Sequence, residues 1–450
     1  MPSIDRQNYL DSIWEPYPSM RDGSLRVSDL KHLEKKFLPE LRLGAKVLSL
    51  SDREGLLRLG SQDEIWEVEL KGAWPLVGKD DKVVDGRKVI QPGDCIWLDL
   101  NDCQWGSRSL QARIETMVLL APCQNEYPGK PGYWVTGQKW SQFVARVREY
   151  FTQSGCREVW TPSLVVCPGM EPTLDPLEVQ VVTGSAGGKT LYLPTSPELH
   201  LKKLLAMGTG DLFEIKVCYR DGEVSDHHQP EFWMLEWYRA FADLKHIGKD
   251  IEGLLQYLYA AGTFEGVCPK ISQCRMSDLF RRFLDFDLTP ETSRRDLTDQ
   301  CYKWQLPIEG YEPWDDLFHL LFLAKIEPLL AELGPLIVTH FPPSQAALAR
   351  LTSDGWADRF EFYWQGLEIA NAFNELNDPE EQARRCERDN RERTERGRKS
   401  LPVDEKFLAA LKTGMPPSGG IALGLERLFM AGTGIEDIRR VRAFSIEDSL

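Results

Sequence analysis

Four stretches of this sequence hold charged side chains at spacings that suit chemistry. The first, Phe213 to Arg239, reads FEIKVCYRDGEVSDHHQPEFWMLEWYR, with two alternating apolar runs around a charged loop. Arg220 ends the first run, and Glu231, Glu236 and Tyr238 lie on the second. In a strand, a carboxylate two residues before a phenol shares its face, where the two could line a pocket for an amine. Taken alone, the stretch is better explained as a half-exposed hairpin with ordinary surface charges.

The second stretch, Arg359 to Leu376, predicts a hairpin with a tight turn at Gln365–Gly366. The turn puts Glu361 and Glu368 on opposite arms, where their carboxylates can converge. Converging carboxylates repel unless a cation lies between them, and Mg²⁺ bridging phosphate oxygens is the natural occupant. Glu361, Glu368 and Glu375 are seven residues apart, a spacing that a heptad helix would also give. The run Phe-Glu-Phe-Tyr-Trp, however, favours a strand.

The third stretch, Ser418 to Gly434, predicts a short strand that reaches Gly424 and is followed by a helix. Glycine permits close approach of a ligand or of another backbone. Arg427 falls in the first turn of the predicted helix and could reach phosphate oxygens. The alternative is an ordinary amphipathic helix with a capped end.

The fourth stretch, Leu191 to Gly208, predicts a helix with Ser196 at the N-cap, Pro197 at the first helical position and Gly208 at the C-cap. Glu198 then has two interpretations. It stabilises the helix dipole, or it supplies a carboxylate for a substrate ammonium.

The chemistry that these stretches suggest is positioning and charge neutralisation. The sequence contains no Gly-x-Ser-x-Gly elbow and no Walker A loop. His227 and His228 lie in a polar loop, where we expect solvent-exposed imidazoles. Arg220, Arg427 and a metal ion would stabilise charge while a carboxylate attacks the α-phosphate of a nucleotide.

Positioning these groups requires a large α+β domain. At 450 residues, 42% of them hydrophobic and 27% charged, the chain suits a globular protein of two or more domains. After about residue 135, strands and helices follow one another without a βαβ rhythm, which favours an antiparallel sheet flanked by helices. We expect a helix at Gln138–Gln153, a strand at Glu158–Val166 that Thr161–Pro162 interrupts, and a mixed-sign helix with solvated faces at 379–400.

Residues 1–125 predict a separate β-rich domain. Short strand candidates recur between turn residues, at Ala45–Leu50, Leu56–Leu59, Ile65–Leu70, Lys82–Ile90, Cys95–Leu100 and Ala112–Leu120. This spacing suggests a small barrel, and we predict a five-stranded OB-type barrel in residues 1–125. Residues 121–132 are rich in Pro and Gly and predict a linker to a second domain, residues 126–450.

Charge and hydropathy exclude several classes of function. A net charge of −15 lacks the broad basic footprint of a general nucleic-acid binder. No Cys or His cluster has zinc spacing. No apolar run is long enough to cross a bilayer and the N-terminus lacks a secretory signal, so we expect a cytoplasmic protein.

The four stretches, in this order, resemble class II aminoacyl-tRNA synthetases. Phe213–Tyr238 resembles motif 2, Ser418–Arg427 motif 3 and Glu158–Pro162 motif 1. Over residues 135–450 the chain is most similar to a lysyl-tRNA synthetase paralogue family, the elongation factor P–(R)-β-lysine ligases. The segments that carry the resemblance are TSPELHLKKLLAMG, HQPEFWMLEWYR, HFPPSQAALARL, LEIANAFNELND and SGGIALGLERL.

The resemblance implies a role for each matching position. Arg220 would act catalytically on the α-phosphate of ATP and Arg427 on the triphosphate tail. Glu361 and Glu368 would hold Mg²⁺. The implied ATP-binding set is Arg220, Asp221, Glu223, Gln229, Phe232, Glu368, Ile369, Gly424 and Arg427. The implied amino-acid-binding set is Ser196, Pro197, Glu198, Glu236, Tyr238, Glu375 and Ala422.

One position links this chain to the ligases, and one position and one region depart from their pattern. Ala422 stands where lysyl-tRNA synthetases usually have Gly and the ligases have Ala, which favours β-lysine over α-lysine as the substrate. Gly222 stands where the best-known members have Glu, so Glu223 or a backbone group must contact adenine. The best-known ligases also lack any domain that corresponds to residues 1–125.

The resemblance implies an ATP-dependent ligase that activates a lysine-like amino acid as its adenylate. The acceptor would be a lysine side chain of elongation factor P, and the enzyme would be a homodimer. One alternative is a lysyl-tRNA synthetase in which residues 1–125 form a divergent tRNA-binding domain. A second is a binding or regulatory paralogue without catalysis, against which the retained Arg220, Glu361, Glu368 and Arg427 speak.

Overall fold

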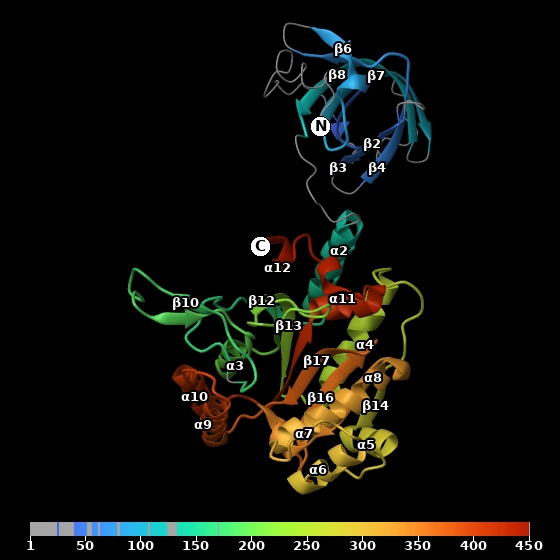
Figure 1. Cartoon of the computed structure of the whole chain (residues 1–450). Coiled ribbons are helices and arrows are strands. Elements are labelled where there is room, and N and C mark those ends of the chain that lie inside the picture. The colour runs from blue at the N-terminus through green and yellow to red at the C-terminus, as the bar shows by residue number, and fades with distance from the viewer. Residues whose placement is uncertain are drawn as a thin grey trace. The chain divides into compact units, whose positions relative to one another are not determined.

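The computed structural model describes residues 25–26, 40–51, 56–61, 64–78, 82–106, 109–123, 133–169 and 171–449. The chain divides into two compact units, Met1–Gln138 and Lys139–Leu450, and Figure 1 labels the elements of each. The predicted domain boundary at residues 125/126 and most of the predicted linker lie outside the described residues, so this boundary stays a prediction.

The first unit contains a closed β-barrel. β2 pairs with β3, β3 with β4, β4 with β8, β8 with β7, and β7 returns to β2. Among these five described pairs, only β4–β8 is parallel. The five strands are β2 (Glu40–Ser51), β3 (Leu56–Ser61), β4 (Glu64–Lys71), β7 (Cys95–Gly106) and β8 (Ser109–Ala121). The five-stranded OB-type barrel predicted from the sequence is therefore confirmed in its strand count and closure.

The barrel interior is filled by alternate side chains of each strand. Leu43 and Val47 on β2, Leu59 on β3, Val68 on β4 and Leu98 on β7 are fully buried in one apolar core. This period-2 pattern is what a half-buried strand requires. Three short strands attach to the barrel, namely β1 (Leu25–Arg26) on β2, and β5 (Pro75–Val77) and β6 (Val83–Asp85), which form a hairpin beside β8.

One predicted strand of the barrel is wrong in length. The sequence predicts a strand over Lys82–Ile90, but β6 ends at Asp85 and a 3₁₀ turn follows at Gly86–Lys88. The Asp85 side chain accepts a hydrogen bond from the Arg87 backbone N–H at 3.2 Å. Such a local cap turns the chain away from the ladder.

The second unit is built on an eight-stranded sheet in the order β14-β15-β16-β17-β18-β13-β12-β9. Neighbouring strands are antiparallel except for the two edge pairs β14–β15 and β12–β9. The strands are β9 (Arg157–Glu158), β12 (Leu212–Tyr219), β13 (Glu231–Ala240), β14 (Ser272–Arg275), β15 (Leu336–Phe341), β16 (Ala357–Trp364), β17 (Leu367–Asn374) and β18 (Ser418–Gly424). A separate hairpin pairs β10 (Glu178–Gln180) with β11 (Thr190–Tyr192).

Helices flank this sheet, as predicted (Figure 1). One core packs α2 (Tyr133–Gln153), α4 (Leu244–Ala260) and α11 (Leu425–Thr433) against the sheet. A second core joins α5 (Met276–Leu284), α6 (Arg294–Lys303), α7 (Trp314–Leu321), the π turn Phe322–Ile326 and α8 (Glu327–Leu330) to the β15 side. A third contains α3 (Glu198–Ala206), α9 (Pro379–Glu395) and α10 (Glu405–Lys412), and α12 (Ile446–Ser449) ends the described chain.

Successive side chains of β13 point alternately into the apolar core and toward the face that carries the candidate site. Leu235 and Trp237 lie in the core under α2 and α4, whereas Met234, Glu236 and Tyr238 point to the opposite face. The predicted shared face of Glu236 and Tyr238 is thus present. The surface-hairpin alternative for this stretch is wrong, because Glu214 and Lys216 on β12 are also buried.

The predicted strand Glu158–Val166 is wrong beyond its first residue. β9 ends at Glu158, and the chain is held at Thr161 by the buried Glu214. The Thr161 backbone N–H and hydroxyl both donate to the Glu214 carboxylate at 2.8 Å, and Lys216 Nζ donates to the Thr161 carbonyl at 2.7 Å. These hydrogen bonds engage the backbone N–H and carbonyl of Thr161, which a continuing strand would need for pairing with a neighbour.

Three predicted helices differ in detail. α2 begins at Tyr133, five residues before the predicted start. α3 begins at Glu198 with Pro197 at the N-cap and Met207, not Gly208, at the C-cap, although Ser196 Oγ still accepts from the Glu198 N–H at 3.0 Å. The predicted helix at 379–400 is α9, and its solvated-face interpretation is wrong for one face, because Gln382, Arg385 and Arg393 are buried. None of the described helices is long and apolar enough to cross a membrane.

Candidate active site

The register of the sheet aligns the predicted substrate residues in rows. Glu236 on β13 pairs with Ala422 on β18, which pairs in turn with Asn371 on β17. The next row on the same face runs from Tyr238 through Gly420 to Phe373. Antiparallel pairing therefore brings residues far apart in the sequence onto one surface.

A cavity of about 220 Å³ opens on this surface. Of the nine residues in the predicted ATP-binding set, all but Asp221 line it, namely Arg220, Glu223, Gln229, Phe232, Glu368, Ile369, Gly424 and Arg427. Asp221 lies apart, with its N–H donating to the Asp175 carbonyl at 2.8 Å. We refer to this space as the nucleotide cavity.

Arg220 is placed to receive an anion. Its guanidinium carbon lies 5.0 Å from the centre of the Phe232 ring, and Nη1 lies 3.8 Å from Glu223. Its Nε is buried and has no hydrogen-bond partner among the described residues. A buried donor without a partner is costly, so the arrangement suits a bound phosphate oxygen.

Arg427 is held in place by its neighbours. Nη1 donates to the Glu368 carbonyl at 2.9 Å, and Nη2 pairs with Nε2 of His228. Burial and then the Arg427 guanidinium lower the pKa of His228 to about 4, so the imidazole is neutral at pH 7 and accepts this hydrogen bond. The sequence placed His228 in an exposed loop, and its half-buried position against Arg427 is a feature that the residue pattern does not reveal.

The predicted carboxylate pair lies beside this cavity. A bulge between Phe362 and Tyr363 sets Tyr363 opposite Glu368, while Glu361 precedes it on the same strand. Burial raises the pKa of Glu361 to about 7, opposed by the Arg359 guanidinium, and Glu368 raises it further. The two carboxylates lie on adjoining arms of one hairpin, and their convergence on a metal ion stays a prediction.

This donor set fits Mg²⁺ that is held jointly by protein and phosphate. Within the described parts of the chain, no three His, Cys, Asp or Glu side chains are grouped to hold a metal ion alone. Mg²⁺ commonly uses one or two carboxylates plus substrate phosphates, so two interacting carboxylates at the edge of a nucleotide cavity suffice. Glu361 is also engaged by Arg359 and by the Tyr363 hydroxyl.

A buried carboxylate forms the far end of the site. Glu236 is 1% exposed, and its two oxygens accept from Tyr238 Oη at 2.6 Å and Ser196 Oγ at 2.8 Å. Burial, followed by the nearby Glu198 carboxylate, raises the pKa of Glu236 well above its ordinary value. The empty pocket therefore favours the protonated acid, and a bound cation favours the carboxylate.

An internal lysine, which the sequence did not single out, completes this end. Lys202 is fully buried, and its Nζ lies 2.5 Å from Glu198 Oε1 and 2.6 Å from Glu375 Oε2. Burial raises the pKa of Glu375 to about 8, although Lys202 lowers it. The i, i+4 spacing of Glu198 and Lys202 was the signal that could have identified the pair.

Gly420 supplies the space that these side chains occupy. A Cβ at this position would lie 2.2 Å from Glu375 Oε1 and 2.4 Å from the Tyr238 ring. Pro197, by contrast, borders neither cavity and caps α3. The amino-acid set is thus gathered around Glu236, apart from Pro197.

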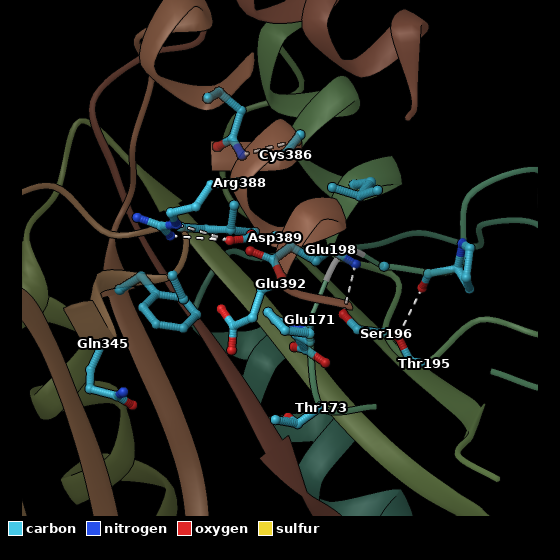
Figure 2. Close-up of a pocket in the computed structure, with 18 of the residues that line it drawn as sticks. Glu171, Thr173, Thr195, Ser196, Glu198, Gln345, Cys386, Arg388, Asp389 and Glu392 are labelled. Atoms are coloured by element: carbon cyan, nitrogen blue, oxygen red, sulfur yellow. Dashed lines mark hydrogen bonds and ion pairs between the residues drawn. The ribbon is translucent and has the colours of Figure 1, made fainter. Parts of the chain in front are cut away.

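A second, larger cavity of about 290 Å³ adjoins the nucleotide cavity. The two share Glu171, Ser196, Glu198 and Phe373. Figure 2 shows this second cavity, with the carboxylates of Glu171, Glu198, Asp389 and Glu392 around one space. No residue pattern in the sequence predicted it, because its walls come from α7, α9 and loops distant along the chain.

Comparison with known proteins decides the family. Residues 138–448 match the family of class II tRNA synthetases (D, K and N). The elongation factor P–(R)-β-lysine ligase of Proteus mirabilis is 38% identical over 313 residues, which cover 68% of this chain and 94% of the relative. This chain belongs to the elongation factor P–(R)-β-lysine ligase family.

Two other ligases of this family match the chain to a similar extent. The ligase of Pectobacterium atrosepticum is 38% identical over 314 residues (69% of this chain, 94% of the relative). The ligase of Haemophilus influenzae is 36% identical over 315 residues (69% of this chain, 95% of the relative). The matched region corresponds to the second unit, so the barrel is additional to what these ligases have in common with this chain.

Proposed function

We propose that this chain activates (R)-β-lysine with ATP and transfers it to a lysine side chain of elongation factor P. Activation joins the amino-acid carboxylate to the α-phosphate and releases pyrophosphate. Transfer forms an amide with the acceptor amine and releases AMP. The names of the relatives, together with the two-ended site, support this activity over tRNA charging.

The observation that carries the proposal is the charge at the amine end. Glu198, Glu236 and Glu375 supply three carboxylates, and Lys202 supplies one ammonium. When all four are ionised, two negative charges remain. A diamino acid brings two ammonium groups, so a lysine-like substrate neutralises the pocket, whereas an ordinary amino acid leaves a buried charge unpaired.

At the nucleotide end, each residue has a physical task. The unpaired Nε of Arg220 would take an α-phosphate oxygen, and Arg427, oriented by His228, would bind the triphosphate. The Phe232 ring would stack on adenine, and Glu223, which also lines the cavity, would contact its edge in place of Gly222. Glu361 and Glu368 would hold Mg²⁺, which neutralises phosphate charge when bound.

Ala422 supports the choice of isomer. It lies opposite Glu236 in the sheet register, so its methyl group narrows the pocket where the amine is held. Moving the amine from the α to the β carbon changes the path that the substrate takes past this methyl group. We propose that Ala422 favours the β-amino acid.

Two further properties belong to the proposal. We propose a cytoplasmic enzyme, and a homodimer formed through the region after β9. In that region Trp160 is 79% exposed and Val166 is 63% exposed, and such apolar exposure supports a protein contact.

The test is pyrophosphate exchange with α-lysine and with each β-lysine enantiomer, followed by mass spectrometry of elongation factor P. We expect the highest kcat/KM for (R)-β-lysine and a mass increase of elongation factor P by one lysine residue. Efficient charging of tRNA with α-lysine, without modification of the protein, would instead establish the synthetase alternative. Absence of exchange with every lysine isomer would establish a non-catalytic paralogue.

A further inference from the structure

We propose that the second cavity admits the acceptor side chain, a primary amine on an apolar stem, to the carbonyl of the bound adenylate. This inference rests on the proposed function and assigns a separate site to the second half of the reaction.

The position of the cavity supports this assignment. ATP would fill the nucleotide cavity, and the amine of the activated amino acid would lie at Glu236, so the reacting carbonyl lies between them, near Ser196 and Glu198. These two residues are also part of the wall of the second cavity. The second cavity therefore reaches the carbonyl along a path that neither ATP nor the amino acid occupies.

The lining suits an aliphatic ammonium. Apolar side chains such as Leu199, Phe407 and Leu408 can pack along a methylene stem. Glu171, Asp389 and Glu392 supply carboxylates around the same space (Figure 2). Such a mixed lining is what a lysine side chain requires, because its stem is apolar and its end is a charged donor.

A buried acceptor without a partner points to the same ligand. Gln382 on α9 lines the cavity and is 1% exposed. Its Oε1 has no hydrogen-bond partner among the described residues, while its Nε2 contacts Cys386 Sγ at 3.7 Å. An ammonium or amine donates N–H groups, so it would satisfy this oxygen.

One face of α9 builds this wall. Gln382, Cys386, Asp389, Glu392 and Arg396 recur at spacings of three and four residues, so they share a face of the helix, and all line the cavity. Asp389 pairs with Arg388 at 3.1 Å, and Glu392 pairs with Arg396 at 3.0 Å. Removing the two carboxylates would therefore leave two arginines facing an incoming ammonium.

Glu171 is placed to accept the proton that the acceptor must lose. It lines both cavities, and in the described part of the chain no salt bridge engages its carboxylate. The arriving ammonium gives one proton to this carboxylate. The neutral nitrogen then attacks the carbonyl carbon, a C–N bond forms, the C–O bond to phosphate breaks, AMP leaves with the electron pair, and the amide nitrogen loses its second proton to solvent.

The experiment separates the two half-reactions. The double variant Asp389→Asn/Glu392→Gln removes two carboxylates from the cavity wall. The matched control, Glu387→Gln/Glu395→Gln, makes the same charge change on exposed positions of the same helix that do not line the cavity. For each protein we would measure pyrophosphate exchange with (R)-β-lysine, transfer to elongation factor P, and transfer to hydroxylamine, a small acceptor that is neutral at pH 7.

We expect the cavity variant to lose transfer to elongation factor P by about tenfold or more, as for loss of charge-assisted contacts. Exchange and hydroxylamine transfer should stay within about twofold, which also shows that the variant is folded, and the control should match the unsubstituted chain. Unchanged protein transfer, an equal loss of exchange, or an equal loss in the control would each overturn the inference. Absence of exchange in the unsubstituted chain would overturn the proposed function itself.

Discussion

At the residue scale, the proton on Glu236 is coupled to substrate binding. Burial, followed by the Glu198 carboxylate, raises the pKa of Glu236 well above its ordinary value, so the empty pocket favours the protonated acid. A substrate ammonium favours the carboxylate, so binding releases a proton. Between the lowered pKa of the bound state and the raised pKa of the empty pocket, affinity for a lysine isomer should therefore rise with pH, by at most about tenfold per pH unit.

Calorimetry in two buffers of different ionisation enthalpy measures this release directly. We expect one proton per bound amino acid, and we expect Glu236→Gln to abolish the release and to weaken binding. A binding enthalpy that is independent of the buffer would contradict this assignment of the proton.

Gly420 tests the packing of the same pocket. Replacing it with Ala puts a methyl group 2.2 Å from Glu375 Oε1 and 2.4 Å from the Tyr238 ring, so both side chains must move. We expect pyrophosphate exchange to fall by about 100-fold, and stability to fall by about 1–3 kcal/mol, as is usual for overpacking. Gly248→Ala is the control, because the nearest atom to its added methyl is 3.9 Å away, on Ile337. Normal exchange in Gly420→Ala would mean that neither Glu375 nor Tyr238 needs its present position.

At the scale of the element, the sequence predicted what depends on periodicity and on local turns. Alternation along β13 placed Glu236 and Tyr238 on one face, and the tight turn after β16 put Glu361 and Glu368 on opposite arms of one hairpin. The sequence did not predict the roles of residues whose partners come from distant parts of the chain. Lys202 and His228 acquire their roles from Glu375 and Arg427, which lie more than a hundred residues away in the chain. The predicted strand beyond β9 is wrong for the same reason, because the Thr161 backbone N–H donates to the Glu214 carboxylate.

The helix α9 shows how a mixed-sign sequence can serve the interior. Arg393 is 1% exposed and donates to the carbonyls of Glu171 at 3.0 Å and Leu174 at 2.6 Å. It also contacts Asp175 at 3.2 Å. Arg393 therefore holds the loop at residues 171–175 in place, and with it Glu171, which lines the second cavity.

We expect Arg393→Met to destabilise the chain by about 1–3 kcal/mol, because it removes the buried guanidinium that bonds the carbonyls of Glu171 and Leu174. Urea unfolding measures this loss, and faster proteolysis within residues 171–175 would locate it. Arg391→Met, an exposed position on the same helix, is the control and should change stability by less than about 0.5 kcal/mol. Equal stability of the two variants would show that the loop does not depend on Arg393.

At the scale of the whole molecule, the exposed Trp160 bears on assembly. A side chain of this size that is 79% exposed, followed in the same segment by Val166 at 63%, suits a protein contact after β9. We expect light scattering to give a dimer for the unsubstituted chain and a monomer for Trp160→Glu. Val267→Glu introduces the same charge at a site that is 91% exposed elsewhere in the unit and should leave the dimer intact. A dimer in both variants would place the interface elsewhere.

The barrel and the catalytic unit should be separable. The described apolar cores each lie within one unit, one of them between Leu41 and Leu119 and the other three after residue 139. The family model matches residues 138–448, nearly the whole of the second unit, so we expect the activation chemistry to need no barrel. A chain that begins at Tyr133 should therefore keep pyrophosphate exchange within about twofold and unfold cooperatively, as a domain with its own core does. If the shortened chain instead keeps exchange but loses transfer to elongation factor P, the barrel contributes to acceptor binding. Loss of both, with the fold intact by circular dichroism, would mean that the barrel shapes the active site itself.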